Sequence, residues 1–356
     1  MSRNQMSSPE NEDFFDPLPD SLLLLIFNKL CDSRSLAQCL LVSKRFSSLV
    51  FQADNVFLSI PTPKPKSASS HRNRASRNLL RTLVHKFIAK PLQFFPCVAA
   101  PKSPGNSGCI SYYSPNEVLK HFKNVKSLHI KVPFQCEKIG LECSNSLLKW
   151  QAEFSGELKN CVVLSATSIQ ECNKNHCCIN HVEEGGGGGT VGQILNDDEL
   201  KLRIVTTISC LIAASARHLL LKQILAEHHM LENVTISDVN KQGRLCVGKD
   251  QIVEMRNAMK SLAVSESSSS IERTPVPDLS MKLWYVPVLE LPATGYLMKG
   301  ATLVVIKPVN GVTRKGSNQS DSFDFDGDKS EKMAFVEAAR MMVKMKKSYA
   351  MTMNSF

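Results

Sequence analysis

Six apolar residues in succession, Leu22 to Phe27, constrain this chain more than any other feature of its sequence. A helix on a protein surface needs one apolar stripe, whereas a helix that is apolar around its whole circumference must be covered on both sides. Each Leu-sized side chain left in water forfeits about 1.5–3 kcal/mol. The surrounding helical segment, about 35 residues long, is too small to bury this surface alone. Either the rest of the chain or a second protein must therefore cover it.

The flanking residues predict three short helices. Pro19 suits a first helical turn, because its missing N–H would have no partner there in any case. Asp32 or Ser33 can cap a second helix, and Ser43 can cap a third. Apolar residues recur at helical spacing in each segment: Leu22, Ile26 and Leu30, then Leu36, Cys39 and Leu40, then Phe46, Leu49 and Val50.

This segment resembles an F-box. The family pattern is Leu-Pro, an acidic residue, leucines, Ile-Phe, a later Leu, a capped second helix and Val-Ser-Lys/Arg-x-Phe-x-x-Leu. The chain fills these positions with Leu18, Pro19, Asp20, Leu22, Leu23, Ile26, Phe27, Leu30, Leu36, Val42, Ser43, Lys44, Phe46 and Leu49. The region from Leu283 to Pro292 also looks like the plant group described as auxin-up-regulated F-box proteins.

The resemblance implies that the apolar surplus docks a Skp1-type adaptor. The chain would then be the non-catalytic subunit of an SCF (Skp1–cullin–F-box) ubiquitin ligase that recognises a target protein for ubiquitination and degradation, reaching the cullin and RING subunits through the adaptor. The target itself is not indicated. The residues that the resemblance assigns to adaptor binding are Leu18, Pro19, Leu22, Leu23, Ile26, Phe27, Leu30, Leu36, Val42 and Phe46. The alternative interpretation is that Leu18–Leu49 is only a fragment of a helical core.

Composition narrows the class of protein. The chain has 356 residues, of which 43% are hydrophobic and 21% charged, which excludes disorder from end to end. No secretory signal is recognisable, so the twelve cysteines are interpreted as thiols in the nucleus or cytoplasm. The longest apolar segment, Ile204–Ala216, is too short to span a membrane and fits a buried helix. We therefore expect a protein that is neither secreted nor inserted in a membrane.

The net charge of +10 is concentrated in one segment. Between Asn55 and Asn116 there are nine Lys and Arg residues and no Asp or Glu. A solvated linker, a nuclear import signal and a nucleic-acid contact remain three interpretations of this segment. Nucleic acid is the least favoured because Lys64–Lys90 contains one aromatic residue, Phe87, and so offers no stacking platform. A basic, nucleic-acid-associated nuclear protein is the competing function.

We predict an α+β fold in which a small all-α module precedes a mixed α/β domain. The predicted divisions are a leader at 1–13, the F-box at 14–60, a basic Pro/Ser linker at 61–77 and a recognition domain at 78–348, with flexible loops at 97–115, 173–192, 265–278 and 311–329. Helix–strand pairs ending at Ile130 and Ile236, with a strand at Leu158, suggest leucine-rich-repeat units. Their irregular spacing leaves an ordinary α/β or α+β domain equally open.

One segment could hold a metal ion. Cys172, His176, Cys177, Cys178 and His181 are possible zinc ligands, but no paired C-x-x-C elements bracket them, so a thiol-bearing loop is favoured. The glycine run at Gly185–Gly189 lacks the Gly-Lys-Ser/Thr ending of a phosphate-binding loop. We expect no metal, no cofactor and no catalytic residues.

Overall fold

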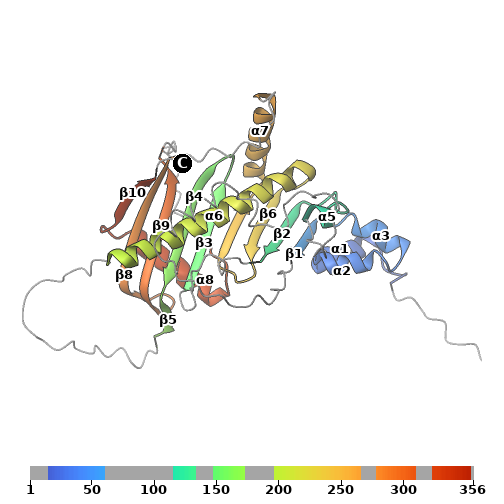
Figure 1. Cartoon of the computed structure of the whole chain (residues 1–356). Coiled ribbons are helices and arrows are strands. Elements are labelled where there is room, and N and C mark those ends of the chain that lie inside the picture. Colours follow the sequence, from blue (N-terminus) through green and yellow to red (C-terminus); the bar gives the residue numbers. More distant parts are fainter. Residues whose placement is uncertain are drawn as a thin grey trace, which may run out of the picture.

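A single mixed sheet organises the protein, as a computed structural model shows (Figure 1). The structure describes residues 15–60, 115–133, 147–172, 196–265, 278–309 and 323–353. In Figure 1 the three N-terminal helices lie at one end of the sheet, and a long helix crosses one of its faces.

The three N-terminal helices form where the capping residues predict them. They are α1 (Asp20–Leu30), α2 (Ser33–Cys39) and α3 (Lys44–Val50). The Asp32 carboxylate accepts a hydrogen bond from the backbone N–H of Ser35 at 3.0 Å, so Asp32 rather than Ser33 caps α2. The Ser43 hydroxyl accepts from the backbone N–H of Phe46 at 3.1 Å and caps α3. The prediction of three short helices is confirmed.

The sheet has ten strands in the described residues, and nine follow the order β1-β2-β6-β7-β3-β4-β9-β8-β10, with β5 paired to β9. β1, β2 and β6 run parallel to one another, β7 is parallel to β3, and the other pairs are antiparallel. The strands are β1 (Asn55–Ser59), β2 (Ser127–Val132), β3 (Leu147–Phe154), β4 (Leu158–Ala166), β5 (Ser168–Glu171), β6 (Asn233–Asp238), β7 (Gly243–Val247), β8 (Leu279–Leu291), β9 (Tyr296–Pro308) and β10 (Tyr349–Met353).

Helices cover the two faces of the sheet and create two cores. On one face, α5 (Pro115–Leu119) and α6 (Asp197–Glu227) bury a core that continues without a break into the three N-terminal helices. On the other face, α8 (Lys329–Val343) covers β8 and β9 and buries a second core. The remaining helix, α7 (Lys249–Ser265), projects beside α6 in Figure 1. The predicted α+β class is confirmed.

The helix α6 is long and apolar enough to cross a membrane by length and composition, with a mean hydropathy of 1.7 in its most apolar window. It packs on β3, β4 and β7. Nine of its side chains are buried, among them the charged Arg217 and the imidazole of His218. Packing against the sheet therefore accounts for part of its apolar sequence: 39% of the most apolar window is buried, and within the predicted buried helix Ile204–Ala216 the buried residues are Thr207, Cys210 and Ala214.

The structure decides between the two predicted architectures. β2 and β6 are parallel neighbours with Ile130 opposite Ile236, which explains why their sequences resemble each other. However, β7 is antiparallel to β6, and β4 is antiparallel to both of its partners, so no continuous repeat layer forms in the described residues. The leucine-rich-repeat interpretation is wrong, and the ordinary α+β domain is correct.

Two segments differ from their predicted conformations. Residues 55–60 were expected to continue the all-helical module, but Asn55–Ser59 form β1, because Val56 and Leu58 alternate into the core. Residues 311–329 were expected to be flexible, but at the end of this segment Phe323 and Phe325 are buried against α8. The predictions for 61–77, Lys64–Lys90 and 173–192, including the possible zinc ligands from His176 to His181, lie outside the described residues.

Candidate functional site

The three N-terminal helices are held together by a small aromatic and aliphatic core. Leu23, Phe27 and Leu36 are almost completely buried, and Phe46 is nearly so. The ring of Phe46 packs edge-on against Phe27, with centroids 5.4 Å apart, and against Phe15 at 5.6 Å. These contacts fix the angles between α1, α2 and α3.

Arg45 on α3 ties the start of α1 to this core. Its guanidinium donates to Asp20 Oδ1 from Nε at 2.9 Å and from Nη2 at 2.7 Å. It also donates to the backbone carbonyls of Phe15, Asp16 and Leu18. Sequence reasoning missed this role, because only the fold brings residue 45 to the segment before α1.

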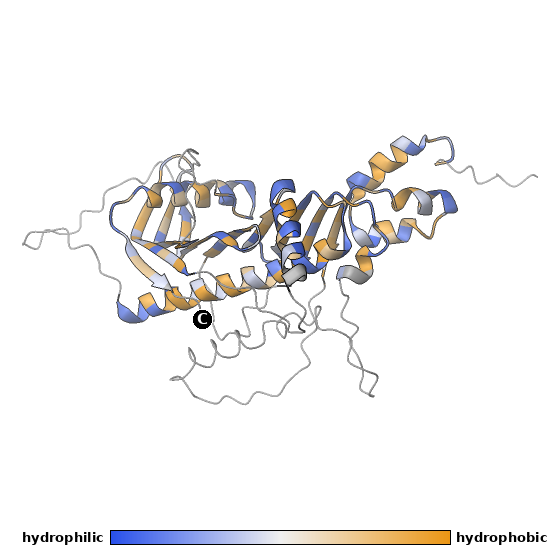
Figure 2. Ribbon diagram, turned by 90° about the horizontal axis from the view of Figure 1, so that it is seen from above, coloured by the Kyte–Doolittle hydropathy of each residue, from blue (hydrophilic) through white to orange (hydrophobic). Residues whose placement is uncertain are grey.

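One face of α1 is left uncovered by the described residues. Leu22 is 46% exposed, Leu25 57%, Ile26 44% and Leu30 39%, at the three- and four-residue steps of a single helix face. We call these four residues the α1 apolar face. In Figure 2, which views the structure from above, α1 carries hydrophobic colouring at the end of the sheet. Several large aliphatic side chains exposed together are typical of a protein-docking surface.

A second exposed apolar pair lies in the turn between α2 and α3. Leu41 is 88% exposed and Val42 is 66% exposed. The backbone N–H groups of both residues donate to carbonyls of α2, from Leu41 to Gln38 and from Val42 to Cys39, so the turn is held in place. An ordered turn that displays two aliphatic side chains adds to the apolar surface offered by α1.

The structure divides the ten predicted adaptor-binding residues into two groups. Leu23, Phe27, Leu36 and Phe46 belong to the core, so their side chains do not lie on the exposed surface. Exposed or partly exposed are Leu18, Pro19, Leu22, Ile26, Leu30 and Val42. Leu25 and Leu41 belong to the exposed surface and were not predicted, although Leu25 shares the helical spacing that identified Leu22.

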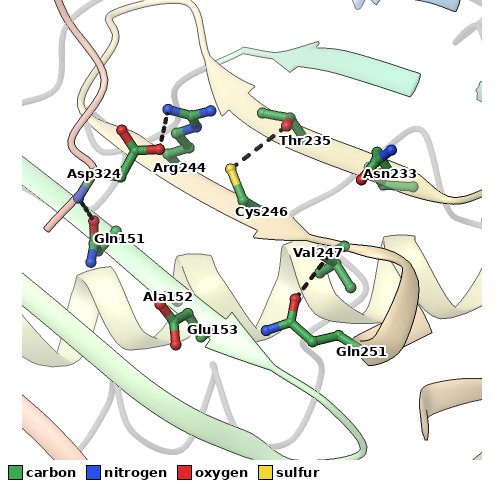
Figure 3. A pocket seen from close by; sticks show the side chains of 12 residues that line it. Gln151, Ala152, Glu153, Asn233, Thr235, Arg244, Cys246, Val247, Gln251 and Asp324 are labelled. Carbon is green, nitrogen blue, oxygen red and sulfur yellow. Dashed lines mark hydrogen bonds and ion pairs between the residues drawn. The ribbon is translucent and has the colours of Figure 1, made fainter. Parts of the chain in front are cut away.

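A second candidate site is a pocket of about 370 Å³ on the sheet face opposite α6 (Figure 3). Its walls come from β3, β6 and β7, from the start of α7 and from the segment before α8. Arg244 forms an ion pair with Asp324 at 2.7 Å, and the backbone N–H of Asp324 donates to Gln151 Oε1. The Thr235 hydroxyl lies 3.6 Å from Cys246 Sγ. These polar groups largely satisfy one another, so the pocket does not indicate a particular ligand.

The same face of the sheet carries one histidine with a perturbed pKa. His129 on β2 lies 2.8 Å from the Ser237 hydroxyl through Nε2, and its ring meets Phe57 edge-on. Burial lowers the pKa of His129, and the charges of Lys131 and Arg244 lower it further, while Asp326 opposes them. A neutral imidazole bonded to a hydroxyl fits a structural role in the sheet. Within the described ranges, no cluster of three His, Cys, Asp or Glu side chains could hold a metal ion.

Comparison with known proteins identifies the class. The F-box-like family model matches residues 15–55, which contain α1, α2 and α3. F-box proteins as a class are substrate receptors of SCF ubiquitin ligases. No solved structure matches the chain.

Curated relatives extend the similarity to nearly the whole chain. The chain is 37% identical to the F-box protein At4g18380 of Arabidopsis thaliana, over 98% of this chain and 95% of the relative. It is 38% identical to the F-box protein At5g46170 of the same plant, over 97% and 94% of the two chains. The F-box protein AUF2 of Arabidopsis thaliana is 28% identical over 97% of this chain and 100% of the relative. The chain belongs to the F-box proteins, and its relatives are plant proteins that include the auxin-up-regulated group.

Proposed function

We propose that this protein is the target-recognition subunit of an SCF ubiquitin ligase and marks a target for degradation. The α1 apolar face binds a Skp1-type adaptor, which connects the chain to the cullin and RING subunits. The sheet domain presents the target to the ubiquitin-loaded enzyme, and the rate of transfer rises because the two are held close together. The chain's own residues contribute binding and orientation.

The observation that supports this proposal is the exposure of the α1 apolar face on a module that has a packed core of its own. Leu22 and Ile26 project from one side of α1, whereas Leu23 and Phe27 on its other side are buried. Covering a Leu-sized side chain contributes about 1.5–3 kcal/mol. Two such residues together could therefore change the affinity for an adaptor by at least about a hundredfold.

The experiment is a binding titration of the double variant Leu22→Asp/Ile26→Asp against a purified Skp1-type adaptor. We expect at least about a hundredfold weaker binding. Both side chains are more than two-fifths exposed, so the variant is expected to fold. Its circular dichroism and urea midpoint check this.

The matched control is Leu202→Asp, which makes the same chemical change on the exposed surface of α6. It should bind the adaptor like the unmodified chain. If the double variant keeps its adaptor affinity while folded, the assignment of this face is wrong.

The cellular part of the proposal is that the protein acts in the nucleus, the cytoplasm or both. The cysteines of the described residues are all free thiols, which fits these reducing compartments. Imaging of the tagged full chain tests it, and retention in the secretory pathway would contradict it.

A further inference from the structure

The two edge strands of the sheet, β1 and β10, differ in whether their outer backbone groups have partners. At one edge, the backbone N–H of Phe57 in β1 donates to the carbonyl of Cys31 at 2.8 Å, and Asp32 bridges to the same residue. The connection between α1 and α2 therefore occupies part of this edge. At the other edge, β10 pairs with β8 on one side and with no strand of the described residues on the other. Alternate backbone N–H and C=O groups of β10 point outward from the sheet.

The sequence of β10 lacks the charges and prolines that protect many edge strands. Its five residues read Tyr-Ala-Met-Thr-Met. Inward-facing charges and prolines are common devices against pairing with another chain. β10 is short, which is itself one such device, but its composition does not oppose pairing with an added strand.

The register of three strands gives β10 a half-exposed apolar row. Tyr349 lies opposite Leu283 of β8, and Leu283 lies opposite Val304 of β9. Met351 lies opposite Met281, which lies in turn opposite Ile306 of β9. The β8 and β9 members are buried in the core under α6. By contrast, Tyr349 is 45% exposed and Met351 43%, so each row ends on a side chain that lacks its outer neighbour.

The other side of β10 is bordered by basic residues. Ala350 lies opposite the exposed Lys282 of β8. The single methyl group of Ala350 leaves room for the long Lys282 side chain to reach across it. The exposed Lys346 and Lys347 lie just before the strand, separated from Tyr349 by Ser348. In the part of the chain that the structure describes, no acidic side chain pairs with these three lysines. In a strand added beside β10, residues on one face would lie next to Tyr349 and Met351, and residues on the other face would lie toward Lys282.

We propose that the free edge of β10 binds an extended segment of the target protein in which apolar and acidic residues alternate. The segment adds a strand to the sheet: main-chain hydrogen bonds hold it, its apolar residues complete the rows ending at Tyr349 and Met351, and its acidic residues face Lys282. Binding by a second copy of this chain is disfavoured, because β10 carries no acidic residue and two sets of Lys346 and Lys347 would repel. Only the statement that the segment belongs to a ubiquitination target rests on the proposed function.

The test measures peptide binding to the full chain in complex with a Skp1-type adaptor. The probe is a capped, labelled peptide of about eight residues in which Val and Glu alternate. Two further peptides serve as comparisons: one has the same composition with Val and Glu in separate blocks, and the other has every backbone amide methylated. We expect the alternating peptide to bind at least about tenfold more tightly than either. Hydrogen exchange should slow in residues 349–353 when it binds, and not in β1.

Variants of the edge complete the test. Tyr349→Asp/Met351→Asp should weaken binding at least about tenfold, because it removes the apolar row and repels the acidic peptide. The control Val253→Asp makes a similar change at an exposed position of α7 and should bind normally. Equal binding of the block or methylated peptide, or unchanged binding by the folded edge variant, would overturn the proposal. A dimer of the full chain that the edge variant dissolves would also overturn it.

The same samples separate this inference from the proposed function. The edge variant should retain the adaptor, since α1 lies beside β1 at one end of the sheet and β10 forms the other end. Loss of the peptide with retention of the adaptor supports the edge site. Failure of the adaptor to bind the unmodified chain would instead contradict the proposed function.

Discussion

Gly243 shows how one residue can be fixed by its neighbour in the sheet. A Cβ atom at this position would lie 2.1 Å from Cε2 of Trp150, on the adjacent strand β3. Trp150 cannot move aside easily, because it is buried and the Arg217 guanidinium lies 4.5 Å from its ring centroid. Glycine is therefore the residue that fits at this position without displacing Trp150.

We predict that Gly243→Ala lowers the free energy of unfolding by about 1–3 kcal/mol, through overpacking against Trp150. Urea denaturation followed by tryptophan fluorescence measures the change. Gly248→Ala is the matched control, because its nearest contact would be Asn233 Oδ1 at 4.0 Å, and its effect should stay within about 0.5 kcal/mol. Equal effects of the two substitutions would show that the tryptophan contact does not matter.

His218 links stability to pH. Its ring stacks on Phe154 with centroids 4.2 Å apart, and its Nε2 has no hydrogen-bond partner among the residues that the structure describes. Burial, aided by the charge of Lys222, lowers the pKa of His218 to about 3. The unfolded chain would bind a proton at this residue near pH 6.5. The unfolded state therefore holds more protons between these values, and His218 makes the fold less stable as the pH falls from about 6.5 toward about 3.

We predict that His218→Gln flattens the dependence of unfolding free energy on pH. The difference in slope from the unmodified chain should reach up to about 1.4 kcal/mol per pH unit between about pH 6 and pH 4. Urea midpoints measured across this range test it. The exposed His229→Gln is the control and should leave the slope unchanged. Parallel pH profiles for all three proteins would contradict the assignment to His218.

At the scale of elements, α8 holds the turn between β8 and β9. The Glu337 carboxylate accepts hydrogen bonds from the backbone N–H groups of Ala293 at 2.8 Å and Thr294 at 2.9 Å, and from the Thr294 hydroxyl at 2.6 Å. Hydrogen bonds to a charged acceptor are stronger than hydrogen bonds between neutral groups. One side chain therefore fixes the hairpin over the second core.

We predict that Glu337→Ala lowers the free energy of unfolding by about 1–2 kcal/mol and speeds hydrogen exchange at residues 292–296. Backbone N–H groups that lose their carboxylate acceptor open to water more readily. Glu254→Ala, on the exposed surface of α7, should change neither quantity. Unaltered exchange in the hairpin would mean that the β8–β9 ladder alone holds the turn.

Elements were predictable where one face is buried and the pattern is simple. The helix–strand pairs ending at Ile130 and Ile236 and the strand at Leu158 correspond to α5 with β2, α6 with β6, and β4. β3 was missed because both of its faces are buried: Lys149 is 5% exposed and Gln151 7%, on the face opposite that of Trp150. Lys149 is compensated by Glu331 at 3.0 Å, and no local pattern reveals a partner so distant in the chain.

The candidate docking site was predictable in location but not in detail. Family spacing selected Leu22, Ile26 and Leu30, and the structure leaves all three exposed. Spacing could not separate them from Leu23 and Phe27, since a helix that is apolar all round has no distinctive face in its sequence. Which side is covered depends on α3 and on the sheet.

At the scale of the whole molecule, the F-box and the sheet share one core. β1 follows α3 directly and pairs with β2, so the three N-terminal helices lead into the sheet before Lys64, the first of the nine basic residues. Buried residues run without interruption from Leu36 through Val56 and Leu128 to Ile236. A rigid connection of this kind would hold a bound target in a fixed orientation relative to the adaptor, which favours transfer by proximity.

This continuity predicts that the adaptor-binding surface unfolds together with the sheet. Ile236→Ala on β6 removes a fully buried side chain and should cost about 2–4 kcal/mol. Both tryptophans, Trp150 and Trp284, lie in the sheet, so their fluorescence reports its unfolding, while adaptor binding reports the F-box. The variant should lower the urea midpoints of the two signals by the same amount, when the adaptor is kept dilute so that its binding does not stabilise the fold. Met230→Ala, at an exposed position, should shift neither midpoint. An adaptor-binding midpoint that stays in place while the fluorescence midpoint falls would show that the three helices fold independently of the sheet.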